Sequence, residues 1–194
     1  MLPIGPLMIE HRLIERMIDI LKDELQKIED LNQIDPIFID NVVDFIRTYA
    51  DQTHHGKEED ILFRELEKKE ISSEHKTIMD ELINEHIFGR KTTGELVQAK
   101  EKFLQGEEEA LSQVINKIKS LIEFYPKHIE KEDKHFFIPV MNYFTKEEQD
   151  AMLIEGQIFD RKMIHRKYNT LVAHFEKSRN LLKKESNAKW LDFI

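Results

Sequence analysis

Two ten-residue segments of this chain, 74 positions apart, share one pattern of residue types. Residues 54–63 and residues 128–137 both read His-x-x-Lys-Glu-acidic-x-x-apolar-Phe when they are aligned without a gap. A shorter echo, Glu-His, is found at residues 10–11 and at residues 85–86, which are 75 positions apart. A repeat of this kind predicts two similar halves related by an approximate two-fold axis, near which equivalent residues come together.

Apolar residues recur at intervals of three and four along much of the chain, which is the pattern of amphipathic α-helices. Helix starts are indicated by Asp35 before a proline, by Ser72, and by a Thr-x-x-Glu capping box at residues 145–148. These signals predict four long helices and then a fifth, over about residues 6–31, 36–68, 73–104, 108–137 and 146–184.

Long helices joined by short connections lie antiparallel to their neighbours. We therefore expect an all-α fold, namely an up-down-up-down antiparallel four-helix bundle with an additional C-terminal helix. The bundle is expected in residues 1–144, and residues 145–194 are expected to form a helical extension.

The composition limits the chemistry of any site. The chain has no cysteine, which excludes disulfides, thiolate zinc sites and cysteine-held iron–sulfur clusters, so a metal must be held by His and carboxylate. The net charge of −9 argues against nucleic acid or an anionic membrane as the main partner. No segment approaches the roughly 20 apolar residues of a membrane span, and no signal-peptide pattern is present, so we expect a cytoplasmic protein.

The repeat places an imidazole and a carboxylate on one helix face twice. Residues i and i+4 lie one turn apart on a helix, which pairs His54 with Glu58 and His128 with Glu132. Apolar residues follow both pairs, so the pairs are expected to face the core rather than to be solvated ion pairs. With the two histidines of the Glu-His echo, the predicted metal ligands are His11, His54, Glu58, His86, His128 and Glu132.

These donors suit Fe, Mn, Zn or Co, and two carboxylates that can bridge favour two metal ions over one. Two Fe(II) ions would bring four positive charges against two glutamates. An oxo or hydroxo bridge, or an exogenous ligand, is expected to supply the remaining negative charge.

Four further side chains are candidates for an additional ligand or for a group that supports the ligands. His55 and His135 have isoleucine as their counterpart in the other half, so both rank below the six. His135 follows His128 by seven residues, which places it on the same predicted face. Tyr125, one turn before His128, can either reach the site with its hydroxyl or serve as a bundle aromatic. Glu59 would take part if the helix register were shifted by one residue.

A histidine, then His-x-x-x-Glu, then a histidine, then His-x-x-x-Glu on four successive helices resembles the hemerythrin-like, or HHE cation-binding, family over about residues 1–144. The resemblance implies a non-haem di-iron bundle whose two glutamates bridge the irons and whose histidines leave a coordination position open. The animal oxygen carriers differ, because they place two histidines on the third helix and a histidine with an aspartate on the fourth. The chain looks closer to the microbial branch, which includes oxygen or redox sensors and iron–sulfur repair proteins.

Three classes of function follow from this resemblance. The first is a protein that binds O2 or a related small ligand such as NO, peroxide or azide, as a carrier, sensor or scavenger. The second is a di-iron enzyme of peroxide or NO reduction, or of the iron–sulfur repair type, although the repair proteins carry a cysteine-bearing N-terminal domain that we do not expect here. The third is a bundle with a structural metal. A site rich in imidazole carries less negative charge than a carboxylate-rich site, which favours ligand binding over strong oxidation.

Overall fold

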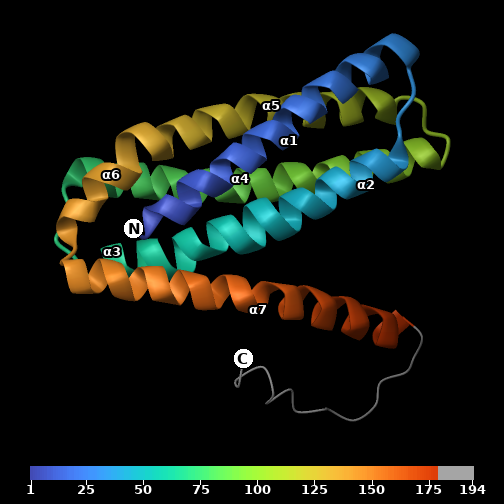
Figure 1. The fold of residues 1–194 in the computed structure, drawn as a ribbon. Coiled ribbons are helices and arrows are strands. Elements are labelled where there is room, and N and C mark those ends of the chain that lie inside the picture. The colour runs from blue at the N-terminus through green and yellow to red at the C-terminus, as the bar shows by residue number, and fades with distance from the viewer. Residues whose placement is uncertain (179–194) are drawn as a thin grey trace.

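The computed structural model describes residues 1–178, and within them the chain is helical without any β-strand. The all-α prediction is therefore confirmed. Figure 1 shows long helical rods that run alternately in opposite directions. The first rod is α1 (Ile4–Leu31), the third is α4 (Ser73–Leu104) and the last is α7 (Lys146–Ser178).

The second and fourth rods are each built from several helical segments. The second rod consists of α2 (Pro36–Phe45), η1 (Ile46–His55), η2 (Glu58–Phe63) and α3 (Arg64–Leu66). The fourth rod consists of α5 (Ala110–Lys131), η3 (Glu132–Phe136) and α6 (Phe137–Val140), and the short η4 (Met141–Tyr143) leads to α7. The segments η1, η2 and η3 are π-helical, so their turns are wider than those of an α-helix.

The predicted helix starts are explained by side-chain caps. A carboxylate oxygen of Asp35 accepts hydrogen bonds from two backbone N–H groups at the start of α2, and Ser72 Oγ accepts one from His75 N. At α7, Thr145 N donates to Glu148 Oε2 and Glu148 N donates to Thr145 Oγ1, which is the predicted capping box. The predicted end of the fifth helix, near residue 184, lies outside the described residues.

The core consists of two apolar clusters with a polar layer between them. One cluster includes Ile14, Ile18 and Ala50, and the other includes Leu7 and Ile61. Each of the first four rods contributes residues to both clusters. Between these two sets of residues, each rod crosses a layer at mid-height of the bundle. Histidines and glutamates of all four rods occupy this level, so the fold places a buried polar layer inside an apolar core.

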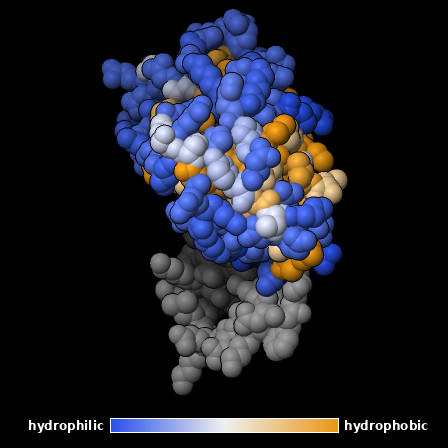
Figure 2. Space-filling model, turned by 90° about the vertical axis from the view of Figure 1, so that its left-hand side faces the viewer, coloured by the Kyte–Doolittle hydropathy of each residue, from blue (hydrophilic) through white to orange (hydrophobic). Residues whose placement is uncertain are grey.

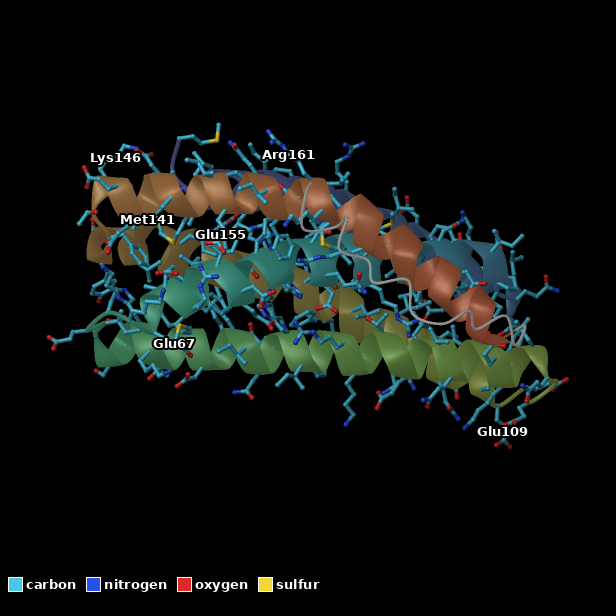
Figure 3. All side chains as sticks on the ribbon, turned by 90° about the horizontal axis from the view of Figure 1, so that it is seen from below. Glu67, Glu109, Met141, Lys146, Glu155 and Arg161 are labelled. Atoms are coloured by element: carbon cyan, nitrogen blue, oxygen red, sulfur yellow. The ribbon has the colours of Figure 1, made fainter. Side chains whose placement is uncertain are left out.

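The last helix, α7, lies along the second rod (Figures 1 and 3). Figure 2 shows the end of the molecule where α6 and the N-terminus lie; its surface is mostly hydrophilic, with apolar side chains gathered in one area. In the described part of the chain, no helix combines the length and the apolar character that crossing a membrane requires.

Candidate metal centre

The polar layer brings all six predicted ligands together and adds one more histidine, His55. Each of these seven residues is at most 2% exposed. They form two groups, within each of which one donor atom per residue lies within 4.8 Å of the others. One group is His11, His54, Glu58 and Glu132, and the other is His55, Glu58, His86 and His128.

The two glutamates reach toward both groups. Glu58 Oε1 lies 3.2 Å from His54 Nε2, and Glu58 Oε2 lies 3.3 Å from His86 Nε2. Glu132 Oε2 lies 3.1 Å from His11 Nε2, and Glu132 Oε1 lies 3.4 Å from His128 Nε2. Each carboxylate thus presents one oxygen to each group, which is the arrangement that a bridging ligand requires.

The inward-facing donors have no hydrogen-bond partner. This holds for all four oxygens of Glu58 and Glu132, for both ring nitrogens of His55, and for Nε2 of the other four histidines. Polar atoms buried without partners cost free energy, so such a set requires a compensating ion. Two donors at about 2.1 Å from one ion, at a right angle, lie about 3 Å apart, and the short N···O contacts match this spacing. The donor set therefore fits bound metal cations.

The outer nitrogen of four histidines donates a hydrogen bond to a carboxylate. The Nδ1···O distances are 2.8 Å for His11 with Asp133, 2.9 Å for His54 with Glu10, 2.6 Å for His86 with Glu59, and 2.8 Å for His128 with Glu85. A proton fixed on Nδ1 leaves the lone pair of Nε2 free for a metal and fixes the ring orientation. Glu59 therefore supports a ligand, whereas sequence reasoning did not identify the other three carboxylates.

The signal for two of these carboxylates was in the repeat. Glu10 and Glu85 precede His11 and His86, yet each supports the histidine of a different rod, His54 or His128. The repeat could have identified the two glutamates as equivalent residues, but their histidine partners depend on how the rods are packed.

The sequence matches the family model "Hemerythrin HHE cation binding domain" over residues 2–138. This chain belongs to that family. The predicted resemblance is thereby confirmed, and the buried cluster lies within the matched residues of this hemerythrin HHE domain. No match was found among curated proteins or among solved structures.

His55 enters the HHE centre because the second rod is π-helical just before it. The segment η1 ends at His55. Within its wide turns, the hydroxyl of Thr53 donates a hydrogen bond to Thr48 O, five residues earlier in the chain. The fourth rod is regular α-helix up to Lys131, so the counterpart Ile129 joins the apolar cluster instead. The ring of His55 stacks on that of His86, with 3.9 Å between centroids. His55, which the sequence ranked below the six, thus joins them as a candidate ligand.

His135 lies outside the HHE centre, which corrects its expected place on the face of His128. The side chain is exposed and belongs to neither donor group. The π-helical segment η3 contains His135, and one extra residue per turn rotates a helix face by about 100°. His135 is therefore not among the candidate ligands that the structure brings together.

Of two other aromatic side chains with polar groups, Tyr125 lies beside the centre and His75 lies away from it. Tyr125 is buried and lines a small cavity together with His55, and burial raises the pKa of its hydroxyl. His75 lies away from the centre, where its Nδ1 is 2.8 Å from the Tyr143 hydroxyl. The side chains of His165 and His174 lie outside those that the structure describes.

The buried glutamates and histidines of the HHE domain shift one another's pKa values. Burial disfavours the charged imidazole of His54, but Glu58 and Glu10 outweigh this effect and raise its pKa to about 10. Burial likewise opposes charge on His86, yet its carboxylate neighbours raise its pKa to about 11. Burial would raise the pKa of Glu58, but His54 and His86 hold it well below the usual range.

Metal binding to the metal-free protein is expected to release protons. At pH 8, which is below the pKa values of about 10 and 11, His54 and His86 hold protons, and a metal requires both imidazoles neutral. Titration calorimetry in buffers of different ionisation enthalpy is expected to show about two or more protons released per chain at pH 8. The apparent metal affinity should accordingly rise with pH until about pH 11, the higher of the two pKa values. Release of less than one proton would contradict this electrostatic description.

Proposed function

We propose that this chain is a non-haem di-iron protein that binds O2 or a related small ligand, such as NO or peroxide, as a carrier, sensor or scavenger. Membership of the HHE cation-binding family and the buried His/Glu cluster support metal binding. The proposed ligands are the six predicted residues and His55. Bound iron would supply redox chemistry and an open coordination position.

The observation that carries the proposal is the unequal number of imidazoles in the two groups. Three histidines, His55, His86 and His128, belong to one group, and only His11 and His54 belong to the other. With both glutamates shared, an ion beside His55, His86 and His128 would have about five protein donors, and an ion beside His11 and His54 would have about four. Because the second ion has fewer protein donors, the His11 and His54 side has room for an added ligand.

A small cavity adjoins His55, on the side of the centre that has three imidazoles. It has a volume of about 90 Å³ and is lined by His55, Tyr125, Thr93 and the pair Arg90 and Asp51, among others. Roughly 10–15 Å³ of such volume suffices for one water molecule, so O2, NO or azide fits easily. Arg90 Nε lies 2.7 Å from Asp51 Oδ1, and its Nη2 lies 2.6 Å from Glu59 Oε1. The guanidinium of Arg90 is thus balanced by two carboxylates at this cavity.

The proposal extends to the organisation of the chain. We propose that residues 1–144 form the up-down-up-down antiparallel four-helix bundle of the family and that residues 145–194 are an addition to it. The alternating directions of the first four rods in Figure 1 support this assignment.

Metal analysis and azide binding test the proposed function. Freshly purified or aerobically iron-loaded protein is expected to hold about two metal equivalents per chain, mainly iron, because the donors form two groups and each glutamate has one oxygen close to a histidine of either group. Azide should then add a visible charge-transfer band to the spectrum of the oxidised protein. Metal content at or below one equivalent rejects the two-metal centre. Two equivalents with a spectrum that azide leaves unchanged would instead indicate a structural metal site.

A further inference from the structure

The two halves of the sequence repeat, formed by the first and second rods and by the third and fourth rods, hold the carboxylates outside the donor groups in nearly the same way. In the second half, Glu85 accepts from His128 Nδ1 at 2.8 Å and from Lys131 Nζ at 2.6 Å. In the first half, Glu10 accepts from His54 Nδ1 at 2.9 Å and also binds Lys57. Each ligand histidine is therefore oriented by a glutamate that a lysine holds, and the two lysines occupy equivalent positions of the repeat.

The halves differ in the second carboxylate on the lysine. Lys131 Nζ also lies 2.7 Å from Glu81 Oε2, and Glu81 is one helical turn before Glu85 on α4. The position of α1 that corresponds to Glu81 is Pro6, which has no carboxylate. The first four rods alone would leave Lys57 with Glu10 as its only carboxylate partner.

The helix α7 supplies a carboxylate at this place. Asp160 Oδ1 lies 2.7 Å from Lys57 Nζ. The side chain of Lys57 is only 5% exposed, whereas that of Lys131 is 25% exposed, so solvent compensates Lys57 less. A buried ammonium group needs its charge balanced by direct partners, which makes the second carboxylate more important in the first half.

Specific contacts fix the position of α7 on the second rod. Arg64 binds both carboxylate oxygens of Glu155, with N···O distances of 2.9 and 2.7 Å. Figure 3 shows Glu155 on the side of α7 that faces the second rod, and Arg161 on the opposite side. At Gly56, a Cβ atom would lie 2.9 Å from Cζ of Phe159, so the glycine lets the Phe159 ring pack directly on the second rod. Gly56 and Phe159 are neighbours of Lys57 and Asp160 in sequence, so this contact fixes the helices next to the ion pair.

We propose that Asp160 is a positioning residue of the metal centre. Asp160 completes the charge balance of Lys57, Lys57 holds Glu10, and Glu10 fixes the ring of His54 toward the metal. The fifth helix is then a functional part of the first half of the centre, in the role that Glu81 has in the second half. This inference rests on the proposed metal-binding function.

The test is the rate at which the iron-loaded full-length chain releases metal to a chelator. Asp160→Asn is expected to accelerate one release phase about tenfold, at the lower end of the 10- to 100-fold range typical when a supporting carboxylate is lost. Asp150→Asn is the matched control, because Asp150 is also exposed on α7 and pairs with a lysine, Lys146, remote from the centre. It should leave both phases unchanged. Glu81→Gln should have a smaller effect than Asp160→Asn, since solvent reaches Lys131.

A double substitution separates positioning from a general effect of α7. Lys57→Met should accelerate the same phase as Asp160→Asn, and adding Asp160→Asn to Lys57→Met should change nothing further. Unchanged release in Asp160→Asn, with wild-type helicity and unfolding temperature, would overturn the inference. An equal acceleration by Asp160→Asn with and without Lys57 would overturn it too, because Asp160 would then act by another route. A wild-type chain that holds no metal after loading rejects the proposed function itself, and this inference with it.

Discussion

Replacing Glu58 by alanine is expected to deprive the chain of both metal ions of the proposed centre. Glu58 presents one oxygen beside His54 and the other beside His86, so its loss removes one donor from each group at once. The expected fall in metal affinity is more than about 100-fold, above the range typical for losing a supporting group. Glu132→Ala should have a similar effect, because Glu132 spans the two groups in the same way. Metal content after iron loading and gel filtration measures both.

Glu59→Ala is the matched control for the Glu58 substitution. Glu59 is adjacent in sequence and also acidic, but it contacts Nδ1 of His86 at 2.6 Å and stays outside the ring of donors. The variant should keep both metals at loading concentrations and lose about tenfold in affinity. If Glu59→Ala lost the metals while Glu58→Ala kept them, the register of the second rod would be off by one residue.

The part of the site that the sequence predicted is the part that a helical period encodes. The apolar spacing marks the rods, and the i, i+4 spacing places His54 with Glu58 and His128 with Glu132 on core-facing stripes. The repeat then relates the halves without any knowledge of their packing. Four donors could be assigned from the spacing within a single helix, and His11 and His86 were added from the repeat.

The remainder of the site depends on features that no simple period encodes. The π-helical segment η1 brings His55 into the core, and η3 turns His135 out of it, since an extra residue per turn breaks the α-helical register. The carboxylates that hold the Nδ1 atoms lie on other rods than their histidines, and Asp160 lies more than 100 residues from Lys57. Such pairs follow only from the three-dimensional arrangement.

His55→Ala is expected to weaken the binding of one of the two metals, because His55 would supply the third imidazole of the His86 and His128 group. Both ring nitrogens of His55 are buried without a hydrogen-bond partner, which leaves a nitrogen available to a metal. The expected result is a fall of about 100-fold in affinity for the weaker metal, so that the chain retains about one equivalent after dialysis. Binding isotherms followed by metal analysis give both values.

His135→Ala is the matched control, because His135 also lacks a counterpart in the repeat but is exposed on the far side of η3. Its metal content and azide response should equal those of the wild type. A second variant, His55→Ile, restores the residue type that the other half has at Ile129 and keeps the position filled. If His55→Ile bound two metals with wild-type affinity, the centre would have four imidazoles rather than five, and its two metal sites would be equal in protein donors. The open position could then no longer be assigned to the His11 and His54 side, because that assignment depends on the extra imidazole of the other group.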